Sequence, residues 1–308
     1  MHYQIGIDAG GTHTTAIAYD LTGQELLTVE TGQGNINADF DGGMANIKEA
    51  IRQIQAKLGS DCERILAGIA GISVTGQYKE VSEALASAFN TKAKAVTDSL
   101  LALYKGLKGE DGIIVIAGTG SVVNGLQNGK ILTVGGYGHL LGDEGSGYAI
   151  SIAGLKSALH SWDKREKNDL IDLFTKHFGV SEMNDCNQKV YRLERPEIAS
   201  LARLIAELAD KGSKDAQDVI FSQADLLAQD IIMGLDRFTD PKPMAIALTG
   251  SVLTNNKMLR TRVEDKVHVK YPNAKFVVSS GSNASGILFD KNDDYYTCLL
   301  YTSDAADE

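Results

Sequence analysis

The sequence has few cysteines, no run of basic residues and no long hydrophobic segment, and each shortage excludes a class of protein. Its 308 residues include three cysteines, Cys62, Cys186 and Cys298, which are spaced too widely for a CxxC pair or a disulfide framework. We therefore expect isolated reduced thiols, as in a cytoplasmic protein. No stretch of 18 residues is uninterruptedly apolar, so we expect neither a transmembrane helix nor a membrane partner.

The charge balance is acidic, with 30 Lys and Arg against 40 Asp and Glu and a formal net charge of −10. Proteins that bind nucleic acid usually carry a basic patch or a high pI, so we expect no nucleic-acid partner. The N-terminus enters a strand-like run directly, without the basic and apolar regions of a signal peptide.

The common nucleotide and metal motifs are also missing. There is no GxxxxGK[ST] P-loop, because Gly129-Lys130 continues into Ile131 inside a predicted hairpin. There is no GxGxxG after a strand, no HExxH helix and no Cys/His cluster with zinc spacing. Any nucleotide site in this chain must therefore use a different motif.

What the sequence has is glycine, 32 residues of it, often directly after a predicted strand. Hydrophobic periodicity predicts an α/β protein with mixed sheets, and the length favours two domains. The expected strands are Tyr3–Asp8, Thr14–Tyr19, Glu25–Glu30, Ile65–Ala70, Lys92–Thr97, Gly112–Ala117, Val122–Gln127, Lys130–Val134, Met244–Leu248 and Lys275–Val278. The expected helices are Asp39–Leu58, Lys79–Phe89, a largely helical region 145–238, Asn255–Lys266 and a last helix that begins near Ser282 or Asn283.

The order strand, glycine-rich turn, strand, tight turn, strand occurs twice, from Tyr3 to Glu30 and from Gly112 to Val134. We interpret this as an internal structural repeat without strong sequence identity.

The first glycine turn follows Asp8 at the end of a strand. Backbone amides of Gly10 and Gly11 and hydroxyls of Thr12 and Thr14 would suit phosphate oxygens, and Asp8 would suit Mg²⁺. The alternative is a plain glycine hairpin that Asp8 caps.

The second turn, Gly118, Thr119, Gly120 and Ser121, also follows a buried strand. Alone it is a common turn. As the partner of the first, it predicts two equivalent loops that grip a polyphosphate from both sides.

The third segment, Gly135–Gly147, has too many glycines for core packing and leads into a helix, so it is typical of a loop shaped around a ligand. Asp143 and Glu144 would bind sugar hydroxyls or help to position a metal, or else act as favourable charges at a helix start. Asp98, at another strand end, is either a base for a substrate hydroxyl or a helix N-cap. The turn Thr249–Ser251 would admit an adenosine or is simply a turn.

Taken together, these motifs resemble the superfamily of sugar kinases, actin and heat-shock chaperones. The resemblance is strongest to N-acetylglucosamine kinases and the related BadF/BadG-type ATPases. It rests on the order DxGGTxT, Thr97-Asp98, AGTGS, GGYGHLLGDEGSG and LTGSV and covers the chain from Ile5 to about Leu288.

The resemblance implies two RNase H-like, actin-like ATPase domains with mixed sheets around a central nucleotide and sugar cleft. We place the first domain at residues 1–110 and the second at 111–282. Residues 283–297 would form a helix that packs back on the first domain. Related kinases are often homodimers, so a homodimer is a further expectation.

The resemblance also implies roles for individual residues in ATP- and Mg²⁺-dependent transfer of the γ-phosphate to the 6-hydroxyl of an amino sugar, first N-acetylglucosamine. Tyr137 stands where the vertebrate enzyme has tryptophan. The implied residues are Asp98 as catalytic base; Asp8 for the metal; Gly10, Gly11, Thr12, Thr14, Gly118, Thr119, Gly120, Ser121, Gly250 and Ser251 for ATP; and Asn35, Asp98, Gly136, Tyr137 and Asp143 for the sugar.

Other functions stay open at this point. The sugar could be N-acetylmuramic acid or glucosamine. BadF-type relatives that activate a dehydratase need thiolate ligands for an iron–sulfur cluster, and Cys62 and Cys186 form no recognisable cluster motif. A non-catalytic sugar sensor would not need the pair Asp8 and Asp98.

The end of the chain, CLLYTSDAADE over residues 298–308, matches a reading frame of a common sequencing-library adapter. We hypothesise that this tail is not native and does not contribute to the fold. Re-amplification from source DNA tests this, because native codons for the same residues would refute it.

Overall fold

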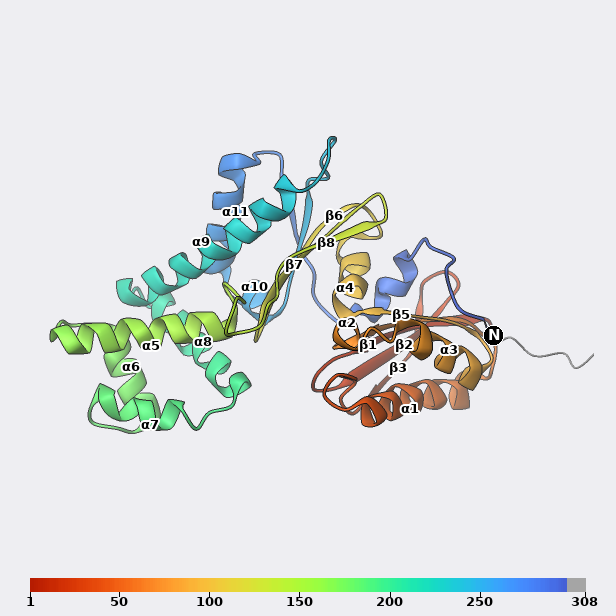
Figure 1. The fold of residues 1–308 in the computed structure, drawn as a ribbon, viewed down its shortest axis with the longest axis horizontal. Helices are drawn as coiled ribbons and strands as arrows, with labels where there is room; N and C mark the ends of the chain where they lie inside the picture. Colours follow the sequence, from red (N-terminus) through yellow and green to blue (C-terminus); the bar gives the residue numbers. More distant parts are fainter. Residues whose placement is uncertain (298–308) are drawn as a thin grey trace, which may run out of the picture. The chain divides into compact units, whose positions relative to one another are not determined.

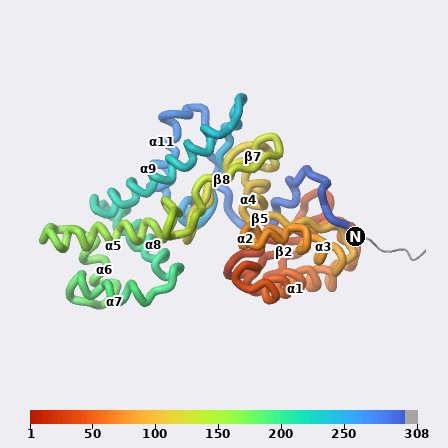
Figure 2. The backbone as a smooth tube through the Cα atoms, viewed as in Figure 1, coloured from red at the N-terminus to blue at the C-terminus, as the bar shows by residue number. Residues whose placement is uncertain are grey.

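The computed structural model describes residues 1–297, so the adapter hypothesis for 298–308 falls outside the described residues. The chain divides into two compact units (Figures 1 and 2). One contains Met1–Glu110 together with the residues from Gly281 onward, and the other contains Asp111–Ser280. Each unit has its own hydrophobic core.

The first unit is built on a five-stranded mixed sheet in the order β3-β2-β1-β4-β5. Strands β1, β2 and β3 form an antiparallel meander, and β4 and β5 run parallel to β1. Its elements are β1 (Tyr3–Ala9), β2 (Thr14–Asp20), β3 (Glu25–Thr31), α1 (Phe40–Leu58), β4 (Cys62–Ile69), α2 (Ile72–Thr75), α3 (Tyr78–Phe89), β5 (Lys92–Thr97), α4 (Asp98–Leu107) and the 3₁₀ helix η2 (Asn283–Phe289).

The second unit repeats this order, because its sheet β10-β9-β6-β7-β8 again joins a three-stranded meander to two parallel strands. The predicted internal repeat is therefore correct. The elements of the second unit are β6 (Gly112–Ala117), β7 (Ser121–Gln127), β8 (Lys130–Gly135), α5 (Gly147–Lys164), α6 (Asp169–Phe178), η1 (Met183–Asp185), α7 (Cys186–Val190), α8 (Arg195–Asp210), α9 (Lys214–Asp236), β9 (Ala245–Thr249), α10 (Ser251–Asn255), α11 (Lys257–Lys270) and β10 (Lys275–Val278).

Three differences from the predicted helices are the most informative. The short helix α2 was not predicted, and its four residues are too few for a periodic signal. The expected helix at 255–266 is two helices, since Asn256 ends α10 and caps α11 through a bond from the Leu259 amide to its side chain. The last helix is of the 3₁₀ type and begins after its N-cap, Ser282.

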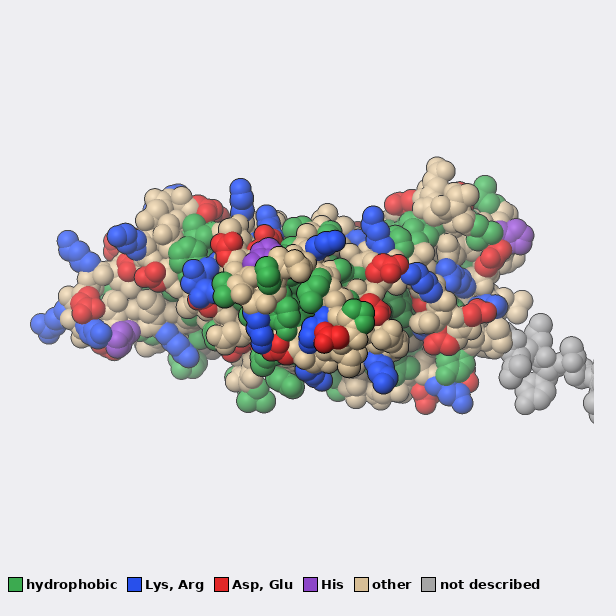
Figure 3. Space-filling view, turned by 90° about the horizontal axis from the view of Figure 1, so that it is seen from above, with side chains coloured by type: hydrophobic (Ala, Val, Ile, Leu, Met, Phe, Trp, Pro, Cys, Tyr) green, Lys and Arg blue, Asp and Glu red, His purple; other side chains and the backbone are tan. Residues whose placement is uncertain are grey.

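Two further observations concern the charge distribution on the surface and the expectation of no transmembrane helix. Acidic and basic side chains are interspersed on the face seen in Figure 3. Among residues 1–297, no helix is long and apolar enough to cross a lipid bilayer.

Candidate active site

Two carboxylates lie at the carboxyl-terminal edge of the first sheet, where the parallel strands β1, β4 and β5 end together. Asp8 is the penultimate residue of β1, and Asp98 follows β5 as the first residue of α4. The register pairs Asp8 with Gly68 and Ile69 with Thr97, which brings both carboxylates to this edge. Ligands of open α/β sheets bind at this edge.

Burial sets the proton affinity of both groups. Burial raises the pKa of Asp98, and the negative charge of Asp8 raises it further, although the Ser99 amide donates to its Oδ1 at 2.8 Å. Burial also raises the pKa of Asp8, while hydrogen bonds from Asn283 and the positive charge of Lys105 oppose this rise. A partly buried carboxylate of raised pKa is what a general base requires.

Asp8 is held by a residue from the far end of the chain. The backbone N–H of Asn283, the first residue of η2, donates to Asp8 Oδ2 at 3.0 Å. The helix reaches this position because Gly6 has no side chain: a Cβ there would lie 1.8 Å from the Ala284 carbonyl oxygen. Asn283 was predicted only as a helix start, and its contact with Asp8 joins residues 275 positions apart, for which the sequence carries no signal.

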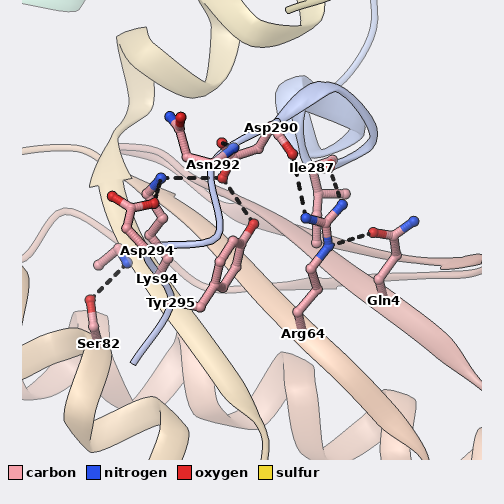
Figure 4. Close-up of polar contacts among 10 residues, drawn as sticks. Gln4, Arg64, Ser82, Lys94, Ile287, Asp290, Asn292, Asp294 and Tyr295 are labelled. Atoms are coloured by element: carbon pink, nitrogen blue, oxygen red, sulfur yellow. Dashed lines mark hydrogen bonds and ion pairs between the residues drawn. The ribbon is translucent and has the colours of Figure 1, made fainter. Parts of the chain in front are cut away.

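The segment that follows η2 is anchored to the same unit by ion pairs and hydrogen bonds (Figure 4). Lys94 contacts Asp290 and Asp294, and Arg64 donates to the carbonyl oxygen of Ile287 at 3.0 Å. Burial alone would lower the pKa of Lys94, but these two carboxylates raise it. Tyr295 is buried and its hydroxyl donates to Asp290, so η2 is fixed at both ends.

Asn35 lies at the same edge of the first sheet. Its loop is held there because Gly34 N donates to Gly10 O at 2.8 Å and Ile36 N to Ala70 O at 3.3 Å. The Asn35 side-chain oxygen accepts from the amides of residues 37 and 38. Within residues 1–297, its side-chain nitrogen has no hydrogen-bond partner.

The first glycine loop offers two exposed amides. The Gly10 N–H donates to His13 O, whereas in the described residues those of Gly11 and Thr12 have no hydrogen-bond partner. Thr14 differs from the prediction. It is fully buried, a Cβ at Gly34 would lie 2.6 Å from its hydroxyl oxygen, and this hydroxyl therefore has no open side for a phosphate.

The second glycine loop is fastened to helix α5. Gly147 N donates to Gly118 O at 2.7 Å, and Ser121 Oγ donates to Glu144 O at 2.7 Å. Ser121 was predicted to bind ATP as part of this loop, and its hydroxyl donor is already used by the carbonyl oxygen of Glu144. The amides of Thr119 and Gly120 have no acceptor within residues 1–297.

Asp143 is not an open sugar ligand. It is 4% exposed, and its Oδ2 lies 2.6 Å from Nη2 of Arg195 on α8. Both atoms lie over Gly120, where a Cβ would be 2.5 Å from the Arg195 nitrogen and 2.6 Å from the Asp143 oxygen. The sequence carried no signal for Arg195, because it lies 52 residues from its partner.

The remaining predicted sugar residues belong to an exposed loop. Tyr137 is 72% exposed, and Gly136 has a φ of 72° and no room for a side chain against Val122. Gly136 is therefore required by the backbone, and Tyr137 is available to a ligand.

The predicted adenosine turn lies beside the second loop. Gly250 has a φ of 89°, and a Cβ there would lie 2.3 Å from Ala117 O. A Cβ on Gly118 would be 3.8 Å from Ser251 Oγ. A cavity of about 330 Å³ opens at Ser251. Its lining also includes Ile150, Ala199, Ser200, Ala202, Arg203, Ala206, Glu207, Asp210, Val252, Asn255 and Asn256.

The donor set fits Mg²⁺ better than a metal held by protein alone. Mg²⁺ is usually bound by one or two carboxylates together with water and substrate phosphates. Asp8 supplies one carboxylate, and the described chain has no group of three or more His, Cys, Asp or Glu that could hold a metal. Cys62 and Cys186 are buried, and burial raises the pKa of Cys62 to about 12.

Curated proteins similar to this chain are sugar kinases by name. A Clostridium acetobutylicum N-acetylmuramic acid/N-acetylglucosamine kinase is 31% identical over 304 residues, 94% of this chain and 97% of that protein. A Dictyostelium discoideum N-acetyl-D-glucosamine kinase is 26% identical over 89% of this chain and 92% of its own length. A Vibrio cholerae glucosamine kinase is 29% identical over 58% of this chain and 62% of its own length.

Solved structures show the same fold. One from Chromobacterium violaceum, provisionally named an N-acetylglucosamine kinase, superposes with a TM-score of 0.71 at 23% identity, covering 93% of this chain and 97% of that one. A ROK family glucokinase from Streptomyces griseus superposes at 0.58 and 14% identity, covering 93% and 97%. The expected two-domain α/β fold is confirmed. The profile of the BadF/BadG/BcrA/BcrD ATPase family matches residues 5–286, and the chain belongs to that family.

Proposed function

We propose that this protein is an ATP-dependent kinase that transfers the γ-phosphate of ATP to the 6-hydroxyl of an amino sugar, with N-acetylglucosamine as first candidate. The observation that carries the proposal is the partly buried carboxylate of Asp98, with its raised pKa, at the edge of the sheet that also carries Asp8. The names of the similar curated proteins support the substrate class and keep N-acetylmuramic acid and glucosamine as alternatives.

In the proposed reaction, Asp98 accepts the proton of the sugar 6-hydroxyl as that oxygen attacks the γ-phosphorus. The oxygen–phosphorus bond to the sugar forms while the bond to the β-phosphate oxygen breaks, and ADP leaves. The role assigned to Asn35 is to orient the sugar with its free amide nitrogen. Tyr137 and Gly136 are proposed as further sugar contacts.

The ATP contacts are assigned to amides that have no acceptor within the described chain. Gly11 and Thr12 in the first unit, and Thr119 and Gly120 in the second, would donate to phosphate oxygens. We assign the cavity at Ser251 to the adenosine. Asp8 would hold Mg²⁺, which neutralises phosphate charge when bound.

The test is an ADP-release assay with Mg·ATP and a panel of N-acetylglucosamine, N-acetylmuramic acid, glucosamine, N-acetylmannosamine and glucose. We expect sugar-dependent turnover on one amino sugar and its 6-phosphate as product. ATP hydrolysis at a rate that does not depend on the sugar, or a sugar product phosphorylated at a hydroxyl other than the 6-hydroxyl, would refute the proposal.

A further inference from the structure

The second glycine loop is held at its carbonyl oxygens by the start of α5. The Gly147 N–H donates to Gly118 O at 2.7 Å, and the Tyr148 N–H donates to Thr119 O at 3.3 Å. Both donors belong to the first turn of a helix, where the amides have no partner within the helix. These bonds occupy carbonyl oxygens of the loop and leave the amides of Thr119 and Gly120 without an acceptor within residues 1–297.

An ion pair holds the same loop at a second point. Nη2 of Arg195 lies 2.6 Å from Oδ2 of Asp143. A Cβ added to Gly120 would lie 2.5 Å from this nitrogen and 2.6 Å from this oxygen, so the pair packs directly on the backbone of the loop. Such a close approach is possible only because residue 120 has no side chain.

The backbone of Asp143 indicates that its carboxylate is needed at this position. Its φ is 65°, in the left-handed region that favours glycine, and the residue is 4% exposed. Its carbonyl oxygen accepts from the amide of Ser146, the N-cap of α5. Non-glycine residues in this conformation persist where the surrounding structure holds them, and they are frequent at functional sites.

Arg195 is placed by a rigid helix start. It is the first residue of α8, Pro196 follows it, and Glu194 and Glu197 form a capping box around this first turn. Helix α8 packs against α5, and the two lie together in the green part of the chain in Figure 1. The ion pair therefore connects α8 to the loop that α5 already holds.

We propose that Arg195 is a positioning residue for ATP, which acts through Asp143 to hold the amides of Thr119 and Gly120 in place for phosphate oxygens. The inference rests on the proposed function, in which these amides bind the phosphates. Donors that are fixed before the ligand arrives lose little freedom on binding, so a loosened loop should bind phosphates less tightly. Asp143 then serves the ATP side of the reaction and not the sugar.

The test is calorimetric titration of the full chain with Mg·ATP, with adenosine and with N-acetylglucosamine. Arg195→Met should raise the Kd for ATP by about tenfold, whereas the Kd values for adenosine and the sugar should change less than about twofold, because neither has a phosphate. Arg195→Lys keeps the charge but not the planar guanidinium, so it should lose only about threefold. Arg192→Met, at an exposed arginine three residues earlier, is the matched control and should bind all three ligands as wild type does.

A double-mutant cycle tests whether the two side chains act as a unit. Asp143→Asn keeps the shape of the side chain and removes its charge, and it should also raise the Kd for ATP about tenfold. Adding Arg195→Met should cause no further loss. Additive losses, or a loss of sugar affinity in Asp143→Asn with ATP affinity intact, would overturn the proposal.

The failure of this inference differs from the failure of the proposed function. A wild-type chain that binds no ATP would refute both. A wild-type chain that binds ATP, together with folded Arg195→Met and Asp143→Asn variants that bind it equally well, would refute only the role of the ion pair. An equal loss of ATP and adenosine affinity would show general damage to the second unit and would also refute that role. Thermal melting checks that each variant is folded, and Arg195→Lys and Asp143→Asn decide the question if Arg195→Met does not fold.

Discussion

In the first unit, the loop after β1 is open, because a Cβ added to the exposed Gly11 would meet no other atom within 4 Å. The carboxylate of Asp8 lies just before this loop, near the end of β1. In the second, β6 ends in a loop that is bound to α5 and covered by the Asp143–Arg195 pair. The strand order is the same in both sheets. Two sheets of the same topology thus present different groups after their first strands. The first unit has a pair of carboxylates of raised pKa, and the second has a glycine loop that is fixed by hydrogen bonds and lies next to a cavity.

The largest expected effect tests the acidic side of this comparison. Asp98→Asn should lower kcat by about 10²–10⁴-fold, because the amide cannot accept the proton of the sugar hydroxyl. Sugar binding, measured by calorimetry, should persist. Asp61→Asn, which removes an exposed carboxylate of the same unit, is the control and should leave kcat unchanged. Wild-type turnover in Asp98→Asn would remove Asp98 from the proposed role.

A matched pair of glycine substitutions compares the two loops directly. Gly120→Ala should destabilise the protein by about 1–3 kcal/mol, because the methyl group displaces Arg195 or Asp143 and leaves a buried acceptor unpaired. Gly11→Ala should leave the melting temperature unchanged, because a Cβ there meets no other atom within 4 Å. It should raise the KM for ATP by about tenfold, because the added methyl group hinders the close approach of a phosphate to the Gly11 N–H. Equal melting temperatures of the two variants would contradict the prediction that only the second loop is tightly packed.

A third prediction concerns the contact that holds Asp8. Asn283→Pro removes the backbone N–H that donates to Asp8, at a helix start where proline is well tolerated, and Ser282 already has a ψ of 140° that suits a following proline. We expect metal affinity, measured with Mn²⁺ by electron paramagnetic resonance in the presence of ADP, to fall by about tenfold. Asn283→Ala keeps the N–H and should lose less; equal effects would show that the backbone bond is unimportant.

The smallest effect lies in the second unit, where burial and the charge of Glu144 raise the pKa of Asp230 to about 6. The folded state therefore binds this proton more tightly than the unfolded state, so stability from this group is present at low pH and is lost as pH rises to about 6. Asp230→Asn should raise the melting temperature by a few degrees at pH 8 and by less at pH 5. If Asp230→Asn raised the melting temperature by the same amount at pH 8 and at pH 5, the result would contradict this prediction.

The sequence predicted best what depends on a single strand and its end. Asp8 and Asp98 were located because each directly follows a buried run, and the repeat was visible in the spacing of turns. It predicted poorly what depends on distant partners. Burial of Thr14 depends on the later loop at Gly34, and the ion pair of Asp143 depends on Arg195, whose sequence neighbourhood has no motif.

The return of the chain to its first unit also has a consequence for synthesis on the ribosome. The second unit is continuous from Asp111 to Ser280, so all of its residues emerge before η2 does. Until residues 283–295 emerge, the Gly6 face of the first sheet lacks its cover, Lys94 lacks both carboxylates and Asp8 lacks its amide donor. Because domains generally fold as units, the second unit can be complete while the first, which begins the chain, is the last to reach its native state.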